Sequence, residues 1–333
     1  MSLMITEYND KHRRNTSKNK CNILLLYQFE KYMVQGEEGE LFPREGEIDA
    51  NTAFPMRQDI LKSILELDYL NEKKIVFRSK QNKDKEYIHQ HVIRPTDDIT
   101  ILRIANKHTT TIVTKDLKEK QEADYQNCIM IIDNRPGIQR ILIEMKKTAF
   151  QDVKQVANIF EYTLNLMMRF CHLHIKLMHL QDPRAFWQFA NDWRSYPEGF
   201  YKITFHLPHL NLERLRKVFD KVLVMSREVF DSDLEWSYKA PQGGALSLDE
   251  KNPYQKELIE WMMKDVGSEN IKLYSNAQKR KAIVVGEDSF LAVGISDTLI
   301  KRLTEVSMSG DLFSSSLLDE IKVKTKTGID LNE

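Results

Sequence analysis

The sequence is poor in cysteine, balanced in charge and without a long uninterrupted apolar run. Its three cysteines, Cys21, Cys128 and Cys171, are odd in number, far apart and without Cys-x-x-Cys spacing. This arrangement argues against a disulfide framework and against a thiolate-bound metal. We therefore expect a protein of the reducing cytoplasm.

Neither sign of charge is in excess, since 49 lysines and arginines balance 49 aspartates and glutamates. A neutral chain has no long-range field that would attract it to nucleic acid or to an anionic membrane. Binding of DNA or RNA would therefore depend on local basic patches. The clearest are residues 279–281 and the lysines Lys322, Lys324 and Lys326.

The most apolar stretch, residues 160–180, is interrupted by Glu161, Arg169, Lys176 and three histidines. Charges inside a bilayer are costly, so no membrane span is predicted and we expect no membrane partner. The pair Gly243-Gly244 is not followed by the Lys-Ser/Thr of a phosphate-binding loop, so that loop is not predicted either.

The length of 333 residues predicts two domains. We expect a mobile basic arm over 1–20, a first domain over 21–181, an aromatic linker over 182–198 and a second α+β domain of unknown role over 199–333. The fold class is α+β, or mixed α/β, with an N-terminal β-meander core flanked by helices.

Apolar spacing in the first domain predicts helices over 57–70 and 151–170. Candidate strands cover 99–104, 109–114, 128–132, 139–144 and 171–180, and a turn at 134–137 contains Pro136-Gly137. In the second domain we expect strands at 201–206, 234–238 and 271–275, a hairpin of 281–285 with 290–294, and helices at 210–229, 253–266 and 296–306.

One segment places ionisable groups where chemistry could use them. Asp124 precedes an apolar strand, and Glu144-Met145-Lys146 closes the next one. Residues i and i+2 of a strand share a face, so Glu144 and Lys146 are expected to project together. Two carboxylates near one point suit Mg²⁺ or Mn²⁺, and Lys146 could orient a metal-bound water. The alternative is that these are ordinary solvated charges at strand ends.

In this order of elements, and with these residues, the segment 57–180 resembles the PD-(D/E)xK nuclease superfamily. The resemblance implies a core of a helix, a three-stranded meander, a helix and a further strand. It also implies Asp124 and Glu144 as metal ligands and Lys146 and Gln155 as catalytic residues. Asp133 is an alternative aspartate, and Glu66 matches the acid that some members carry on the first helix.

The function expected from the resemblance is metal-dependent cleavage of phosphodiester bonds with Mg²⁺ or Mn²⁺. The alternative is a non-catalytic subunit that binds nucleic acid or protein within an intracellular assembly, for example a defence or mobile-element system. The alternating His172, His174 and Lys176 allow a histidine metal cluster, but a solvated strand face is the simpler interpretation.

Overall fold

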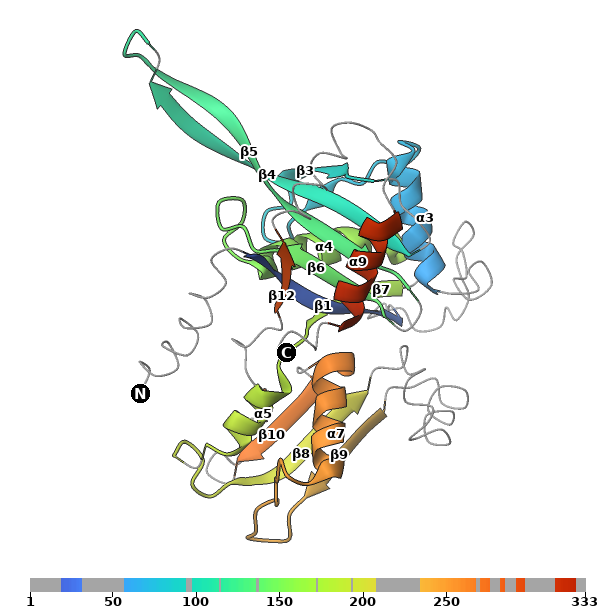
Figure 1. The fold of residues 1–333 in the computed structure, drawn as a ribbon, viewed down its shortest axis with the longest axis vertical. Helices are drawn as coiled ribbons and strands as arrows, with labels where there is room; N and C mark the ends of the chain where they lie inside the picture. The colour runs from blue at the N-terminus through green and yellow to red at the C-terminus, as the bar shows by residue number, and fades with distance from the viewer. Residues whose placement is uncertain are drawn as a thin grey trace, which may run out of the picture. The chain divides into compact units, whose positions relative to one another are not determined.

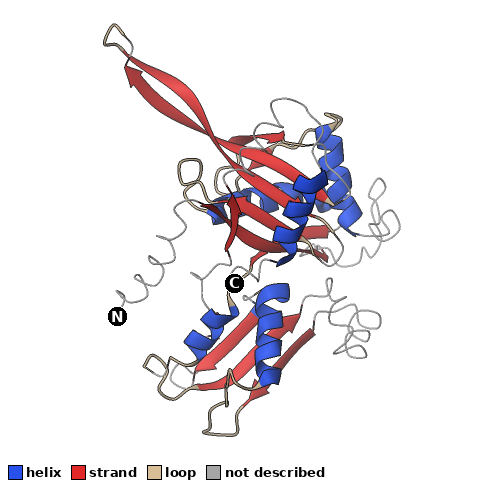
Figure 2. Ribbon diagram, in the orientation of Figure 1, coloured by secondary structure: helices blue, strands red, loops and turns tan. Residues whose placement is uncertain are grey.

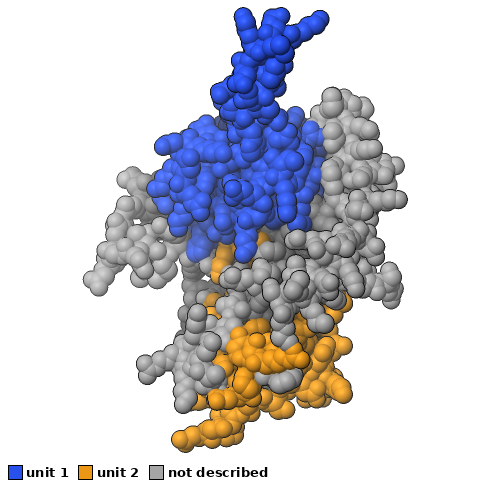
Figure 3. Space-filling model, turned by 90° about the vertical axis from the view of Figure 1, so that its left-hand side faces the viewer, with its two compact units in different colours: residues 1–24, 31–175, 292–333 blue, residues 25–30, 176–291 orange. Residues whose placement is uncertain are grey.

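The computed structural model describes residues 19–31, 57–93, 98–113, 115–135, 138–171, 173–192, 194–207, 234–267, 270–275, 282–284, 292–296 and 315–327. The chain divides into two compact units (Figure 3). Unit 1 contains residues 1–24, 31–175 and 292–333, and unit 2 contains residues 25–30 and 176–291.

Eight described strands form the larger sheet (Figure 1), in the order β12-β1-β6-β5-β4-β3-β2, with β7 paired to β1. Their bounds are β1 Asn19–Lys31, β2 Phe77–Arg78, β3 Glu86–His91, β4 Ile99–Val113, β5 Glu119–Asp133, β6 Arg140–Glu144, β7 Leu173–His179 and β12 Ala292–Ser296. The strands β2 to β6 follow one another as an antiparallel meander. Its longest pair is β4 with β5, which runs without a bulge from Ile99 opposite Asp133 to Val113 opposite Glu119.

Three α-helices are described in unit 1: α3 (Arg57–Tyr69), α4 (Val153–Met167) and α9 (Ser315–Thr327). A short 3-10 turn, Met168–Cys171, follows α4. The α4 helix begins where the Asp152 carboxylate accepts the Gln155 backbone N–H, which satisfies a donor that the first turn leaves open. Its apolar residues recur at helical spacing, and Phe160 is fully buried and stacks on Phe77 of β2.

Unit 2 is built on an antiparallel four-stranded sheet in the order β11-β10-β8-β9, with the helices beside it in Figure 2. Its elements are α5 Pro183–Ala190, β8 Phe200–Leu207, β9 Leu234–Lys239, α7 Pro253–Trp261, a π-helical turn Met262–Val266, β10 Ile271–Ser275 and β11 Ala282–Val284. One core cluster joins Phe186 and Trp187 of α5, Ile259 of α7 and alternate residues of β8 and β10. Both helices therefore cover the same face of this sheet.

The α+β class expected from the sequence is confirmed, as are helices at 57–70 and 151–170. The two strands expected at 99–104 and 109–114 are one strand, β4, because the whole of Ile99–Val113 pairs with β5. The expected linker at 182–198 contains helix α5, which Asp182 caps and Pro183 begins. The β3 strand and the α9 helix were not predicted.

The expected hairpin of 281–285 with 290–294 is wrong. The β11 strand pairs with β10 in the smaller sheet, whereas β12 pairs with β1 in the larger one. Residues 292–333 consequently group with unit 1, although the sequence placed them with 199–333. The expected helix at 210–229, residues 297–306, Pro136-Gly137 and nearly all of the arm at 1–20 lie outside the described residues.

Candidate metal centre

The last turn of α3 places Asp68 in the interior of unit 1. The helix ends just before Asn71, which has a φ of 57° and so adopts the left-handed conformation that commonly terminates helices. The chain then turns back, and the backbone N–H of Ile75 donates to Oδ1 of Asp68 at 2.6 Å. Asp68 is thereby fixed by the helix on one side and by the returning chain on the other.

His89 and His91 come from β3, two residues apart on the strand. They share a face with buried Tyr87, while Ile88 and Gln90 point to the exposed side. The β3 strand is held between β2, where Phe77 pairs with Tyr87, and β4, where Ile104 pairs with His89. The sheet therefore presents both imidazoles to the end of α3.

The three side chains converge on one oxygen atom. Nε2 of His89 lies 2.6 Å and Nε2 of His91 lies 2.7 Å from Oδ2 of Asp68. Their side chains are 5%, 7% and 2% exposed for His89, His91 and Asp68, respectively. Aromatic rings surround the group, with Phe77 edge-on to His89 and Tyr69 edge-on to His91.

Burial alone would raise the pKa of Asp68, but the hydrogen bonds from His89, His91 and the Ile75 N–H lower it more. The net pKa lies well below the usual range for aspartate, so the carboxylate stays ionised. In the hydrogen-bonded form each imidazole must carry its proton on Nε2. This leaves Nδ1 of His91 as a buried atom with no partner among the described residues.

Two imidazoles and a carboxylate are a common donor set for transition metals. One ligand atom from each of Asp68, His89 and His91 lies within 4.8 Å of the others, and no other such group occurs among the described residues. In a tetrahedral site with bonds of about 2.0–2.1 Å, neighbouring ligand atoms are about 3.3 Å apart. The two distances from imidazole nitrogen to Oδ2 of Asp68 would therefore have to widen by about 0.6–0.7 Å.

The carboxylates expected to hold Mg²⁺ do not meet. Met130 pairs with Ile143, so Glu144 lies beside Ile129, five positions along β5 from Asp124. At about 3.3 Å per residue this separation is roughly 17 Å. Because five is an odd number of positions and the strand has no bulge, the Asp124 and Ile129 side chains also point to opposite faces.

Glu144 and Lys146 lie at the end of β6 and just beyond it. Glu144 is buried, and its Oε2 accepts the Ile129 N–H at 3.0 Å. The β6 strand ends at Glu144, so Lys146 lies in the following turn, where its carbonyl accepts the N–H groups of Ala149 and Phe150. Both side chains act on Cys128: burial raises the pKa of that thiol to about 12, with Glu144 adding to the rise and Lys146 opposing it.

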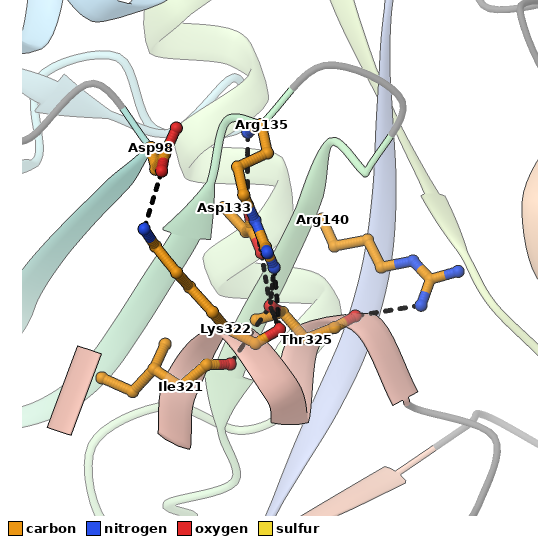
Figure 4. A network of polar contacts seen from close by, with 7 residues as sticks. All are labelled: Asp98, Asp133, Arg135, Arg140, Ile321, Lys322 and Thr325. Carbon is orange, nitrogen blue, oxygen red and sulfur yellow. Dashed lines mark hydrogen bonds and ion pairs between the residues drawn. The ribbon is translucent and has the colours of Figure 1, made fainter. Parts of the chain in front are cut away.

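Asp133, the alternative aspartate, anchors the C-terminal helix (Figure 4). Its carboxylate forms an ion pair with Arg135 at 2.7 Å and accepts the hydroxyl of Thr325 on α9. Arg135 also donates to the carbonyl of Lys322, and Arg140 donates to the carbonyl of Thr325. Asp133 thus helps to attach α9 to the β5–β6 connection.

The two remaining candidates also lie apart from the Asp68 group. Gln155, in the first turn of α4, accepts the Gln151 N–H at 3.2 Å and contacts Tyr87. Glu66 is two residues before Asp68 on α3, and residues at that spacing do not face the same side of a helix.

Comparison with protein-family models, curated proteins and solved structures finds no match to this chain. In the part of the chain that the structure describes, no helix is both long enough and apolar enough to cross a membrane.

His89 and His91 were not predicted as site residues from the sequence. The available signal was His-x-His within the alternating stretch Glu86–His91, a spacing that puts both imidazoles on one face of a strand. The comparable pattern at His172 and His174 was considered instead. Residues 79–86 are mostly polar, so no apolar pattern indicated that β3 begins at Glu86.

Proposed function

We propose that unit 1 is a transition-metal-binding domain, with Asp68, His89 and His91 as ligands. The observation that carries the proposal is the convergence of three donor atoms from two different elements in a buried position. Burial matters because interiors rarely accept an ionised carboxylate and two imidazoles without strong mutual compensation. A bound cation would supply that compensation for all three groups.

The donor set selects the class of metal. Imidazole nitrogen suits Zn²⁺, Fe²⁺, Ni²⁺ or Cu²⁺, whereas Mg²⁺ prefers oxygen donors in an octahedral arrangement. The metal would take the place of the Nε2 protons of His89 and His91. The Ile75 N–H would remain on Oδ1 of Asp68 and orient the carboxylate from outside the metal.

The proposed role of the metal is structural. The ligand side chains are at most 7% exposed, which leaves little access for a polymeric substrate. The ion would join the end of α3 to the middle of the meander through β3. Because such a site forms only in the folded chain, its binding free energy would contribute to folding.

The test compares the intact chain with His91→Gln, after removal of metal and addition of Zn²⁺ or Mg²⁺. Glutamine can still donate an N–H to Asp68, but it is a poor ligand for Zn²⁺. We expect Zn²⁺ and not Mg²⁺ to raise the thermal midpoint of the wild type. When the free Zn²⁺ concentration is about a hundred times the dissociation constant, binding raises the free energy of unfolding by about 2.7 kcal/mol.

His91→Gln should lose this response, whereas His108→Gln, at an exposed histidine of β4, should keep it. Elemental analysis of the purified protein gives an independent reading of one bound transition metal per chain. If the wild type neither retains metal nor responds to Zn²⁺, Fe²⁺, Ni²⁺ or Cu²⁺, the proposal is wrong. Asp68, His89 and His91 then stabilise unit 1 through their hydrogen bonds alone.

The nuclease activity expected from the resemblance is a second candidate. The order of elements supports it in part, since α3, β4-β5-β6, α4 and β7 occur in the sequence order of that family's core, although β2 and β3 lie between α3 and β4. The positions of Asp124 and Glu144 do not support it. Incubation with DNA and RNA in Mg²⁺ or Mn²⁺, against a metal-free control, decides whether any cleavage occurs.

A further inference from the structure

The β4–β5 hairpin extends beyond the rest of unit 1 as a two-stranded arm (Figures 1 and 3). Pairing of β4 with β3 stops at Ala105, and pairing of β5 with β6 covers only Met130 to Asp133. Beyond these points β4 and β5 pair only with each other among the described strands. We call the outer part, Thr109–Val113 paired with Glu119–Ala123, the distal ribbon.

A ribbon of two strands with both faces in water is marginally stable by itself. All ten residues of the distal ribbon are exposed. Every backbone N–H and C=O on its outer edges also lacks a strand partner among the described residues. A third strand would satisfy one of these edges and bury part of the ribbon, so the arm has the form of a docking element.

The two edges differ sharply in charge. The β5 edge, Glu119–Ala123, contains Glu119, Lys120 and Glu122, and charged side chains on an edge strand discourage pairing with another chain. The β4 edge is Thr109-Thr110-Thr111-Ile112-Val113, which has no charge and consists entirely of β-branched residues. Such residues favour strands, so β4 presents the edge that can accept another strand.

We propose that the β4 edge pairs antiparallel with the β4 edge of a second copy of this chain. The pairing would form a continuous four-stranded ribbon, β5-β4-β4-β5, about a two-fold axis. Because Thr109–Val113 carries no charge, no like charges oppose each other within the paired segment. Threonine opposite threonine or valine is a favourable cross-strand pair.

Charge also selects a protein edge over a nucleic acid as the occupant. The described arm from Lys107 to Tyr125 carries Lys107, Lys115, Lys118 and Lys120 against Asp116, Glu119, Glu122 and Asp124. Four positive and four negative charges cancel, so the arm attracts a polyanion weakly.

The experiment compares Thr111→Lys with Gln121→Lys in the full chain. Thr111 and Gln121 are cross-strand partners, so both variants add one lysine to the same face of the same ribbon, but on opposite edges. In a symmetric dimer the lysine at position 111 would occur twice near the axis, whereas position 121 would remain at the outer rim. Circular dichroism confirms that each variant is folded.

We expect light scattering after size exclusion to give twice the chain mass for the wild type and for Gln121→Lys, and the single-chain mass for Thr111→Lys. Amide exchange over 109–113 should slow with rising protein concentration in the wild type and in Gln121→Lys, but not in Thr111→Lys. A wild type that stays monomeric at high micromolar concentration overturns the proposal. So does a Thr111→Lys variant that remains dimeric, or equal dissociation of both variants.

Discussion

Glu144 is a buried acidic residue at the end of β6. Its sequence context, Glu-x-Lys at a strand end, is typical of a metal ligand. In the folded chain its carboxylate accepts the Ile129 N–H and lies near Arg103, whose pKa is lowered by burial while Glu144 acts to raise it. The residue therefore completes the hydrogen bonding of β5 at the point where β6 ends.

Glu144→Ala is expected to destabilise unit 1 by about 1–3 kcal/mol, because it leaves the buried Ile129 N–H without its acceptor. The measurement is denaturant unfolding. Glu72→Ala, the same substitution at an exposed position, should change stability by no more than about 0.5 kcal/mol. If the variant folds with wild-type stability but loses cleavage of DNA or RNA in Mg²⁺, Glu144 belongs to an active site after all.

At the scale of elements, α9 is held by polar contacts as well as by burial of Ile321. Arg135 and Arg140 donate to carbonyls in its last two turns, where a helix favours positive charge. Lys322 reaches Asp98 at 2.7 Å on the other side (Figure 4). These contacts attach the helix to the β5–β6 connection and to the start of β4.

Thr325→Val keeps the shape of a fully buried side chain and removes the hydroxyl that Asp133 accepts. We expect a loss of about 1–3 kcal/mol and faster amide exchange in α9. The reciprocal change Val323→Thr, at an exposed position of the same helix, is the control and should be nearly neutral. Unchanged exchange in α9 of Thr325→Val would mean that the hydrogen bond from Thr325 to Asp133 does not hold the helix.

At the scale of the whole molecule, the two compact units have separate spectroscopic signatures. All four tryptophans, Trp187, Trp193, Trp236 and Trp261, fall within residues 176–291 of unit 2. The Asp68 group lies in unit 1. Tryptophan fluorescence consequently follows unit 2, whereas the proposed metal would act on unit 1.

We expect Zn²⁺ to shift the part of the far-ultraviolet unfolding curve that belongs to unit 1 and to leave the fluorescence transition in place. Phe205→Ala, in the core of unit 2, should lower the fluorescence transition and leave the unfolding of unit 1 in place. The expected loss in the free energy of unfolding of unit 2 is about 3–5 kcal/mol. Coincident transitions that both move with Zn²⁺ would contradict this and show that the units unfold together.

Local patterns in the sequence predicted many of the helices and strands correctly. Apolar residues at helical spacing located α3 and α4, and alternation located β10, because these periods depend only on the geometry of one segment. The same reasoning missed residues 105–108 of β4 and residues 119–127 of β5. An exposed ribbon has no buried face, so its strands lack an apolar pattern.

Only the tertiary structure decided which segments meet. Three contacts join residues that no local period relates. They are the pairing of β12 with β1, the hydrogen bond between Thr325 and Asp133, and the convergence of His89 and His91 on Asp68. Asp124 and Glu144 seemed close because one turn separates their strands, yet register and side-chain alternation keep them apart. The register between two strands is set by which face of each strand is buried. It cannot be predicted from a single motif.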